Sequence, residues 1–270
     1  MNYQEALEYI HGISWTFCKP GLERISTLCK ALGDPQKKLK FIHIAGTNGK
    51  GSTSAMLESV LRESGYKTGL FTSPYIRTFN ERMRVDGENI SDGELAEITE
   101  YVRPFADDMT DKPTEFELIS AIAFEYFSRN NCDVVVLEAG MGGRLDSTNG
   151  IDSALLSIIT GIALDHTAFL GDTVEKIASE HTYLHIFIFI KIKYRSVERL
   201  TVKGKRRAIN SAKWRVHFCR PLANYPLSRL VLAAEKHGAS AFDYACLLCR
   251  YLFHGISEKG GVIERNARDY

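Results

Sequence analysis

The stretch HIAGTNGKGSTSAM, residues 43–56, constrains the fold of this chain more than any other part of its sequence. Three glycines, Lys50 and the hydroxyl residues Ser52 and Thr53 lie there between an apolar run and a segment with helical spacing. Glycines let backbone N–H groups approach a phosphate chain because no Cβ intervenes, and a lysine adds a point charge. We therefore interpret the stretch as a phosphate-binding loop, in which Lys50 reaches the β- and γ-phosphates and Ser52, with Thr53 beside it, can coordinate Mg²⁺. Its spacing departs from G-x-x-x-x-G-K-[ST], and the alternative is an ordinary glycine-rich turn between a strand and a helix.

Up to about residue 180 the chain alternates strand patterns with helix patterns, which predicts a doubly wound, mostly parallel α/β fold. Two capping boxes, beginning at Ser91 and Thr114, predict helix starts, and Pro104 is predicted to end the first of these helices. Strands are predicted over residues 41–45, 67–73, 132–140 and 153–160, and helices over 51–65, 91–102 and 115–130.

The character of the sequence changes near His181. Residues 1–180 carry a net charge of −10 and residues 181–270 one of +11. The run at 181–195 is a low-complexity alternation of Ile, Phe and Lys without turn signals. We expect one ATP-binding domain over 1–180 and an unmatched basic tail over 181–270. A change of reading frame near codon 181 explains the abrupt break, the charge difference and the Ile/Phe/Lys-rich run together, and a native fused tail is the alternative. The run at 183–192 has high β-propensity and no proline, so we expect it to promote aggregation.

Composition and cysteine usage exclude several classes of protein. No stretch has 18 consecutive apolar residues, so no membrane span is expected. The polar start carries no export signal, so we expect a cytoplasmic protein with free thiols. Cys246 and Cys249 form a CxxC inside an apolar run without a second pair at zinc spacing, and we interpret them as structural.

Five motifs in one order support a more specific interpretation. The stretches are GTNGKGST (46–53), LFTSPYIRTFNERMRVDG (70–87), TEFELISAIAFEYF (114–127), VLEAGMGGRLDSTN (136–149) and LDHTAFLGDTVEKIASE (164–180). Together with HGISWTFCKPGLERI (11–25), they resemble the folylpolyglutamate and dihydrofolate synthases of the Mur ligase superfamily. The resemblance implies a Mur ligase-like ATP-binding domain. It also implies an ADP-forming amide ligase that joins L-glutamate to dihydropteroate or folate through an acyl phosphate, with ATP and Mg²⁺.

The resemblance also assigns roles to individual residues. Ser73, Glu138 and His166 are the expected Mg²⁺ ligands, and Lys50, Glu138 and His166 the expected catalytic residues. Without the resemblance, Glu138 is interpreted as a strand-end carboxylate satisfied by a helix N-terminus. His166 is then interpreted as a loop histidine, because Mg²⁺ prefers oxygen ligands. The residues expected to bind ATP are Gly46, Thr47, Asn48, Gly49, Lys50, Gly51, Ser52 and Thr53.

The folate side of the site is expected on two segments. Glu117 or Asp146 would accept hydrogen bonds from the amino edge of a pterin, whereas the alternatives are a helix cap and a turn. Arg82 and Arg84 are candidates for steering a glutamate tail or a phosphate, and solvated arginines are the alternative. The residues expected to bind folate are Thr114, Glu115, Phe116, Glu117, Leu145, Asp146 and Ser147.

The sequence also departs from the family pattern. His181 stands where the family has a lysine that becomes carbamylated, and the Asp-Gly-Ala-His-Asn motif of the family's second half does not occur in residues 181–270. We therefore expect a truncated, inactive chain without the C-terminal ligase domain, and a monomer. Alternatives are a Mur-superfamily ligase for another acceptor, a non-catalytic ATP-binding module, and a nucleic-acid-binding protein. A nucleic-acid partner is not expected, because a basic stripe without order is weak evidence for recognition.

Overall fold

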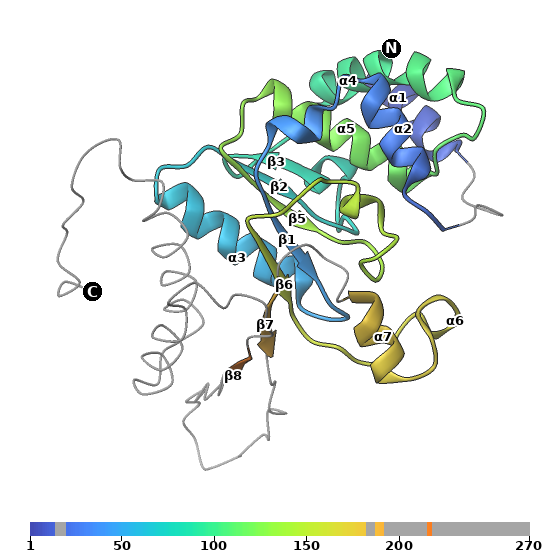
Figure 1. The fold of residues 1–270 in the computed structure, drawn as a ribbon. Helices are drawn as coiled ribbons and strands as arrows, with labels where there is room; N and C mark the ends of the chain where they lie inside the picture. Colours follow the sequence, from blue (N-terminus) through green and yellow to red (C-terminus); the bar gives the residue numbers. More distant parts are fainter. Residues whose placement is uncertain (14–19, 182–186, 192–214, 218–270) are drawn as a thin grey trace, which may run out of the picture.

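A single eight-stranded sheet organises the described part of the chain (Figure 1). The computed structural model describes residues 1–13, 20–181, 187–191 and 215–217. The strand order is β4-β3-β2-β5-β1-β6-β7-β8, with a parallel centre from β2 to β7 and antiparallel pairs at both edges. The strands are β1 (Phe41–Ala45), β2 (Thr68–Phe71), β3 (Met83–Val85), β4 (Glu88–Asn89), β5 (Val134–Glu138), β6 (Leu156–Ile159), β7 (Phe187–Lys191) and β8 (Arg215–His217). The predicted mostly parallel α/β fold is confirmed.

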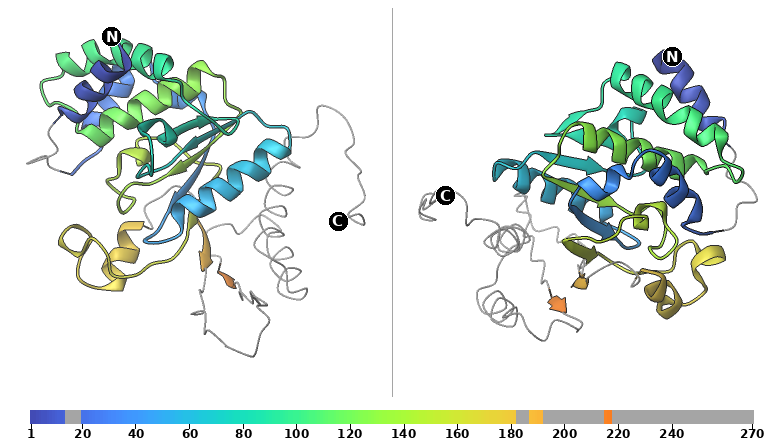
Figure 2. Two further views of the ribbon diagram at one scale, coloured as in Figure 1. Left: turned by 180° about the vertical axis from the view of Figure 1, so that it is seen from behind. Right: turned by 45° about the horizontal axis from the view of Figure 1, so that its top comes forward.

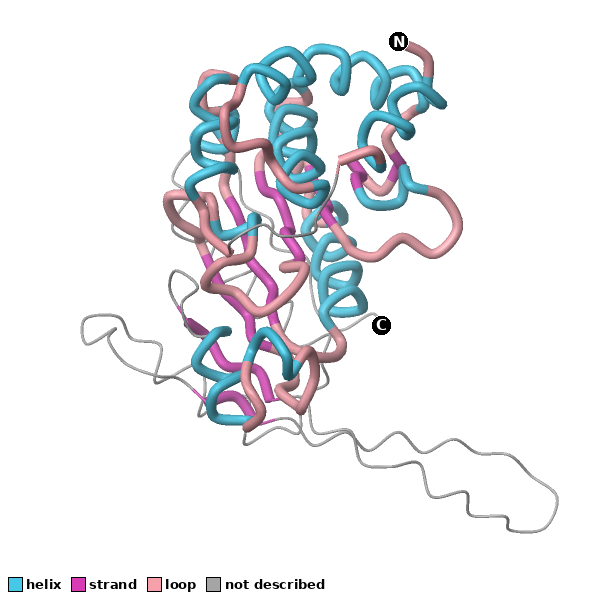
Figure 3. The backbone as a smooth tube through the Cα atoms, turned by 90° about the vertical axis from the view of Figure 1, so that its right-hand side faces the viewer, coloured by secondary structure: helices cyan, strands magenta, loops and turns pink. Residues whose placement is uncertain are grey.

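Helices cover the two faces of the sheet unequally (Figures 1 and 2). Helices α1, α2, α4 and α5 form a layer on one face, called here the four-helix layer. Among the described helices, α3 covers the other face, and α6 and α7 lie together at one end of the sheet. The tube view shows several helices gathered at the end that holds the N-terminus, and short helical segments at the opposite end (Figure 3). The helices are α1 (Tyr3–His11), α2 (Glu23–Ala31), α3 (Lys50–Glu63), α4 (Asp92–Asp108), α5 (Glu115–Arg129), α6 (Thr167–Leu170) and α7 (Val174–His181), with the 3₁₀ turns η1 (Pro35–Lys38), η2 (Phe79–Arg82) and η3 (Ser147–Asn149).

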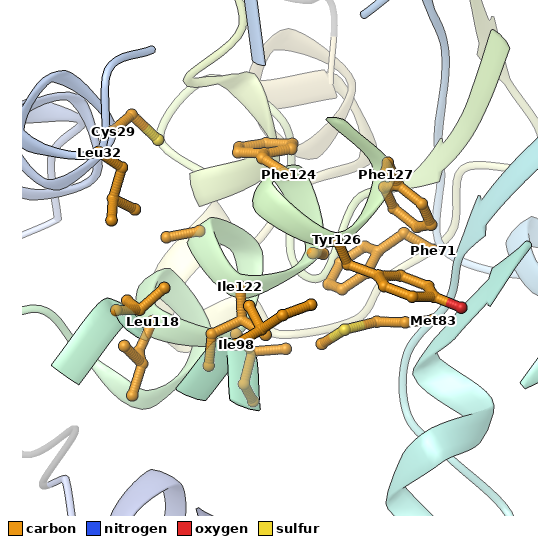
Figure 4. Packing of buried hydrophobic residues seen from close by; sticks show 14 of the residues in the cluster. Cys29, Leu32, Phe71, Met83, Ile98, Leu118, Ile122, Phe124, Tyr126 and Phe127 are labelled. Atoms are coloured by element: carbon orange, nitrogen blue, oxygen red, sulfur yellow. The ribbon is translucent and has the colours of Figure 1, made fainter. Parts of the chain in front are cut away.

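Alternate residues of the central strands pack into two separate hydrophobic cores. Phe41 and Val135 pack into the larger core under the four-helix layer, whereas Ile42 and Val136 pack into the smaller one under α3. Figure 4 shows the larger core, where Phe124 and other α5 side chains lie among residues of α2, α4 and the strands. Because both faces are covered, the strands are apolar throughout, as their unbroken hydrophobic runs predicted.

The helix predicted to stop at Pro104 continues through it. Helix α4 runs from Asp92 to Asp108 with Pro104 inside, so that prediction is wrong. Proline lacks the N–H that would bond back one turn, which weakens a helix but does not forbid it. Val102 and Ala106, on either side of Pro104, are fully buried, and their packing favours the continued helix over the early end. Both predicted capping boxes, at Ser91 and Thr114, are confirmed.

Most of residues 181–270 lies outside the described part of the chain. Residues 187–191 form β7 beside β6, so part of the predicted β-forming run at 183–192 is a strand of the sheet. The Cys246 and Cys249 pair lies outside the described residues. Among the described residues, Cys29 and Cys132 are free thiols, as expected. No helix in the described segments has the length and apolarity needed to cross a membrane.

Candidate functional site

The glycine-rich loop joins the end of β1 to the start of α3, as predicted. Gly46 and Gly49 adopt φ values of 133° and 85°, which residues with a Cβ rarely adopt. Gly49 is the N-cap of α3, so the first N–H groups of that helix point out of the loop without intrahelical partners. A helix N-terminus of this kind attracts anions through its free N–H groups and its dipole.

A segment after β6 holds the loop in shape. The amide of Thr47 donates to the carbonyl of Gly161 at 2.6 Å, and the hydroxyl of Thr160 donates to the carbonyl of Asn48 at 2.8 Å. The Thr47 hydroxyl also accepts a hydrogen bond from the amide of Ala163 at 3.1 Å. The predicted ATP-binding residues therefore divide into two groups. Thr47 and Asn48 bond to the segment 160–163, whereas the stretch from Gly49 onward presents helix N–H groups.

Gly46→Ala should disable the loop. A Cβ at Gly46 would lie 2.2 Å from the Thr160 hydroxyl and 3.1 Å from the backbone of Gly161, and the φ of 133° is strained for alanine. Strain of this kind costs about 1–3 kcal/mol, so the loop must move away from the segment 160–163. We expect a loss of nucleotide affinity of at least about tenfold with a lower melting temperature. Isothermal titration with ADP measures the affinity. Gly93→Ala is the matched control, because its Cβ would meet nothing within 4 Å.

Lys50 lies folded against its own loop. Its ammonium donates to the carbonyl of Gly46 at 2.8 Å and to that of Thr47 at 3.3 Å. These are neutral acceptors, and a phosphate oxygen is a stronger one because it is charged. A bound triphosphate is therefore expected to draw the ammonium away from both carbonyls.

Glu138 ends β5 directly beside the start of α3. Its carboxylate accepts a hydrogen bond from the amide of Ser73 at 3.2 Å, and a Cβ built on Gly51 would lie 3.5 Å from it. The side chain is buried, with 3% of the residue exposed. Burial raises the pKa of the Glu138 carboxyl to about 7, against the opposing effects of the Ser73 amide and the Lys50 charge. The predicted metal ligands Ser73 and Glu138 are thus brought together beside the predicted phosphate loop.

The donor chemistry around Glu138 fits Mg²⁺. A buried carboxylate and the neighbouring Ser73 residue offer oxygen ligands, and the Thr53 hydroxyl is buried without a hydrogen-bond partner among the described residues. Mg²⁺ is usually held by one or two carboxylates plus substrate phosphates and water, not by an all-protein cage. The described part of the chain contains no cluster of three or more His, Cys, Asp or Glu side chains able to hold a metal.

His166 lies in the N-cap position of α6, on the exposed segment that follows β6. Its backbone is left-handed, with φ 48°, and its imidazole is 52% exposed. The nearest carboxylate is that of its neighbour Asp165, 3.9 Å away. His166 contributes to no metal cluster in the described chain, and its role as a second ligand stays a prediction.

The predicted folate-side residue Glu117 is engaged by a residue that the sequence did not single out. Arg24 of α2 donates to both oxygens of the Glu117 carboxylate, at 2.9 and 3.0 Å, and both residues are buried. The amide of Thr114 donates to the same carboxylate at 2.7 Å, which completes the capping box of α5. The cap alternative therefore describes the geometry of Glu117. Its folate role stays a prediction, as it does for Glu115, which bonds to His11 at 2.9 Å.

Asp146 and Ser147 are buried in the loop after β5. The Asp146 carboxylate caps η3 and accepts from the amides of Met141 at 2.8 Å and Thr148 at 3.0 Å. Ser147 bonds to Ser120 of α5 at 2.7 Å.

The remaining predicted folate residues lie nearby. Phe116 packs over Gly140, where a Cβ would lie 2.7 Å from its ring, and Leu145 is half-buried. The two predicted folate segments, 114–117 and 145–147, are thus brought together.

Arg82 is the last residue of η2 and is stacked on aromatic rings. Its guanidinium stacks on the rings of Tyr75 and Phe79, with 5.1 and 5.5 Å to the ring centroids. Its Nε is buried without a hydrogen-bond partner among the described residues, as is that of Arg84. These contacts hold the Arg82 side chain in place, so Arg82 is not the freely solvated arginine that was given as the alternative.

Comparison with known proteins gives a consistent result. Residues 44–197 match the family model described as the Mur ligase middle domain. A dihydrofolate synthase/folylpolyglutamate synthase of Bacillus subtilis is 49% identical over 183 residues, which is 66% of this chain and 42% of that protein. The region that matches the family model extends to residue 197, past the predicted end of the ATP-binding domain at residue 180.

Solved structures agree with these matches. A structure described as a folylpolyglutamate synthase complex with AMPPCP and folate matches with a TM-score of 0.65 and 42% identity, over 67% of this chain and 45% of that one. A structure described as E. coli FolC in complex with DHPP and ADP matches with a TM-score of 0.62 and 37% identity, over 67% of this chain and 43% of that one. The chain spans less than half the length of these relatives.

Proposed function

The chain belongs to the Mur ligases, in the branch of the folylpolyglutamate and dihydrofolate synthases, and we propose that it carries the ATP-binding half of a glutamate ligase. The proposed reaction adds L-glutamate to dihydropteroate or folate and releases ADP. Relatives whose descriptions name AMPPCP with folate, and ADP with DHPP, support this choice of substrates.

The observation that carries the proposal is the meeting of three elements at one end of the sheet. The N-terminus of α3, the end of β5 and the loop after β2 place Lys50, Glu138 and Ser73 together. In open parallel sheets, ligands bind beyond the carboxyl ends of the strands. An anion-binding helix start beside a buried carboxylate is the arrangement that a metal-bound triphosphate needs.

The proposed chemistry divides among these residues. The acceptor carboxylate attacks the γ-phosphorus of ATP and ADP leaves; the glutamate amine then attacks the acyl carbon and phosphate leaves. Lys50 and the first amides of α3 bind and orient the phosphates, and Glu138 with Ser73 would hold Mg²⁺. When bound, Mg²⁺ supplies neutralisation of phosphate charge. His166 as a second ligand, and residues 114–117 with 145–147 as the folate wall, belong to the same proposal.

We also propose that residues 181–270 do not supply the groups of the family's second half, so that the chain binds nucleotide without turnover. The absence of the Asp-Gly-Ala-His-Asn motif from that segment supports this. The division at residue 180 and the change of reading frame are part of the same hypothesis. If neither of the other two reading frames of the coding sequence encodes that motif downstream of codon 181, the hypothesis of a changed reading frame is wrong. We expect the protein to be cytoplasmic and monomeric. Light scattering on the purified chain would check the oligomeric state.

One assay tests both the function and the absence of turnover. ADP release is measured with ATP, Mg²⁺ and glutamate, once with dihydropteroate and once with tetrahydrofolate, beside a titration with ADP. Binding of ADP without glutamate-dependent release is the expected result. Glutamate-dependent release would show that this chain is active, and the absence of any nucleotide binding would contradict the proposed site.

A further inference from the structure

His43 is the single polar side chain of the central strand β1, and none of it is exposed. A buried polar group without a hydrogen bond costs stability, so a histidine in this place needs a partner. Its Nε2 lies 2.8 Å from the hydroxyl oxygen of Thr148, which is in η3 and is also fully buried. The contact joins β1 to the loop after β5, across 105 positions of sequence.

The Thr148 hydroxyl has a second partner, the Asp146 carboxylate, at its Oδ1. A hydroxyl carries one proton and cannot donate to both His43 and Asp146. Backbone amides decide between them. The amide of Thr148 donates to Oδ1 of Asp146 at 3.0 Å, and that of Met141 donates to Oδ2 at 2.8 Å. Because both carboxyl oxygens already accept from amides, the surroundings favour the ionised carboxylate, and the hydroxyl proton points to Asp146.

The direction of every hydrogen bond in this buried chain is then fixed. His43 carries a proton on Nε2 and donates to the Thr148 oxygen, and the Thr148 hydroxyl donates to Asp146. Burial raises the pKa of the Asp146 carboxyl, whereas the Thr148 hydroxyl and the amides of Met141 and Thr148 oppose this effect. The chain of donors that begins at His43 therefore works against the neutral acid that burial favours.

Oxygen Oδ2 of Asp146 lies beside the aromatic ring of Phe116. A Cβ built on Gly140 would lie 3.1 Å from this oxygen and 2.7 Å from the ring, so both approach the same glycine. An ionised oxygen next to an aromatic ring suits a flat heteroaromatic group that carries amino hydrogens, because the oxygen accepts from the amino group and the ring offers apolar contact.

We propose that His43 is a positioning residue of the proposed folate site, which acts through Thr148 to hold the Asp146 carboxylate ready for the amino edge of a pterin. This inference rests on the proposed function. His43 itself does not touch the ligand in this proposal. It selects the direction in which the Thr148 hydroxyl points, and so the charge and orientation of Asp146.

The test separates positioning from stability in the full chain. Thr148→Val removes the hydroxyl with little change of shape, His43→Leu removes the donor, and His43→Gln offers an amide N–H in its place. Thr99→Val is the matched control, because Thr99 is also fully buried and its hydroxyl has no hydrogen-bond partner among the described residues. Titration calorimetry measures the affinities for dihydropteroate and for ADP, and melting curves give the stability of each variant.

Thr148→Val and His43→Leu are expected to weaken dihydropteroate binding about tenfold, the effect of losing one hydrogen bond to a charged group, and to leave ADP affinity unchanged. His43→Gln should recover most of the loss, and Thr99→Val should bind like the unsubstituted chain. The double variant of His43→Leu and Thr148→Val should bind dihydropteroate no more weakly than Thr148→Val alone, because both substitutions break one chain of hydrogen bonds.

The alternative outcomes distinguish this inference from the proposed function. Equal dihydropteroate affinity in all variants, or equal losses for dihydropteroate and ADP that follow the melting temperature, overturn the inference alone. If the unsubstituted chain binds ADP but not dihydropteroate, the folate part of the proposed function is overturned with it.

Nitrogen NMR of the unsubstituted chain, labelled at histidine, is a readout that does not depend on any variant folding. With His43 identified by backbone assignment, we expect a proton on its Nε2. A bare Nε2 would mean that Thr148 donates to His43 and not to Asp146, and this result would overturn the proposal even if every variant failed to fold.

Discussion

Glu138→Gln is expected to weaken Mg²⁺-dependent nucleotide binding about 100-fold and, in the same variant, to stabilise the free chain. Loss of a group that only supports a metal ligand costs about 10–100-fold in metal affinity, so loss of a proposed ligand belongs at the upper end. Glutamine keeps the shape of the side chain and can still accept from the Ser73 amide. The substitution therefore removes charge with little change in packing.

The gain in stability follows from burial of the carboxyl. Burial raises the pKa of Glu138 from 4.5 to about 7, which corresponds to roughly 3 kcal/mol at most. The folded chain binds the proton more tightly than the unfolded chain, so stability falls as pH rises from 4.5 to about 7. Glutamine carries no charge to bury. The advantage of the variant should thus be largest above pH 7 and absent below about pH 4.5.

Two measurements check this prediction. Melting curves at pH 5 and pH 8 give the stability difference, and ADP titrations with and without Mg²⁺ give the metal-dependent part of binding. Glu125→Gln is the control: Glu125 is also buried, but it pairs with Arg129 at 2.7 Å, away from the loop. This control should lose stability and keep its Mg²⁺ dependence. Unchanged Mg²⁺ dependence in Glu138→Gln would contradict the assignment of the ligand.

Arg24→Ala is expected to lower the free energy of unfolding by about 3–5 kcal/mol. The guanidinium and the Glu117 carboxylate are both buried and share two hydrogen bonds, at 2.9 and 3.0 Å. Removal of the arginine leaves a buried carboxylate whose remaining described donor is the amide of Thr114. An uncompensated buried charge costs far more than the pair itself contributes. Urea unfolding at pH 7 measures the loss.

Two further variants separate charge from packing. The double variant Arg24→Met with Glu117→Gln removes both charges and keeps an acceptor for the Thr114 amide, so it should recover most of the lost stability. Lys176→Ala breaks an exposed pair with Asp172 and should cost less than about 1 kcal/mol. A double variant as unstable as Arg24→Ala would show that packing of the arginine stem dominates.

Local patterns in this sequence predicted local structure well. The run at 41–45 is β1, and the capping boxes at Ser91 and Thr114 begin α4 and α5. In each case the residues that determine the element are within a few positions of it. Pro104 is the exception, because the burial that maintains α4 comes from packing against other elements.

Long-range partners were not predictable in the same way. Arg24 lies 93 positions from Glu117, and no local pattern marks it as the counter-ion. The division of the loop into an anchored part and a helix start depends on hydrogen bonds to Gly161, more than a hundred residues away in sequence. Motif order located the Ser73 and Glu138 pair, but only the fold shows the distance between them.

The hydrogen bonds between the loop and the segment 160–163 have a consequence for biosynthesis. A nascent chain that has emerged only as far as β5 already holds the whole glycine-rich stretch, yet it lacks the carbonyl of Gly161 and the hydroxyl of Thr160. Since domains fold during synthesis as their parts become available, the ability to bind nucleotide should be acquired late, after Ala163 has left the ribosome. The nucleotide site is therefore completed by a segment that is made long after the glycine-rich loop itself.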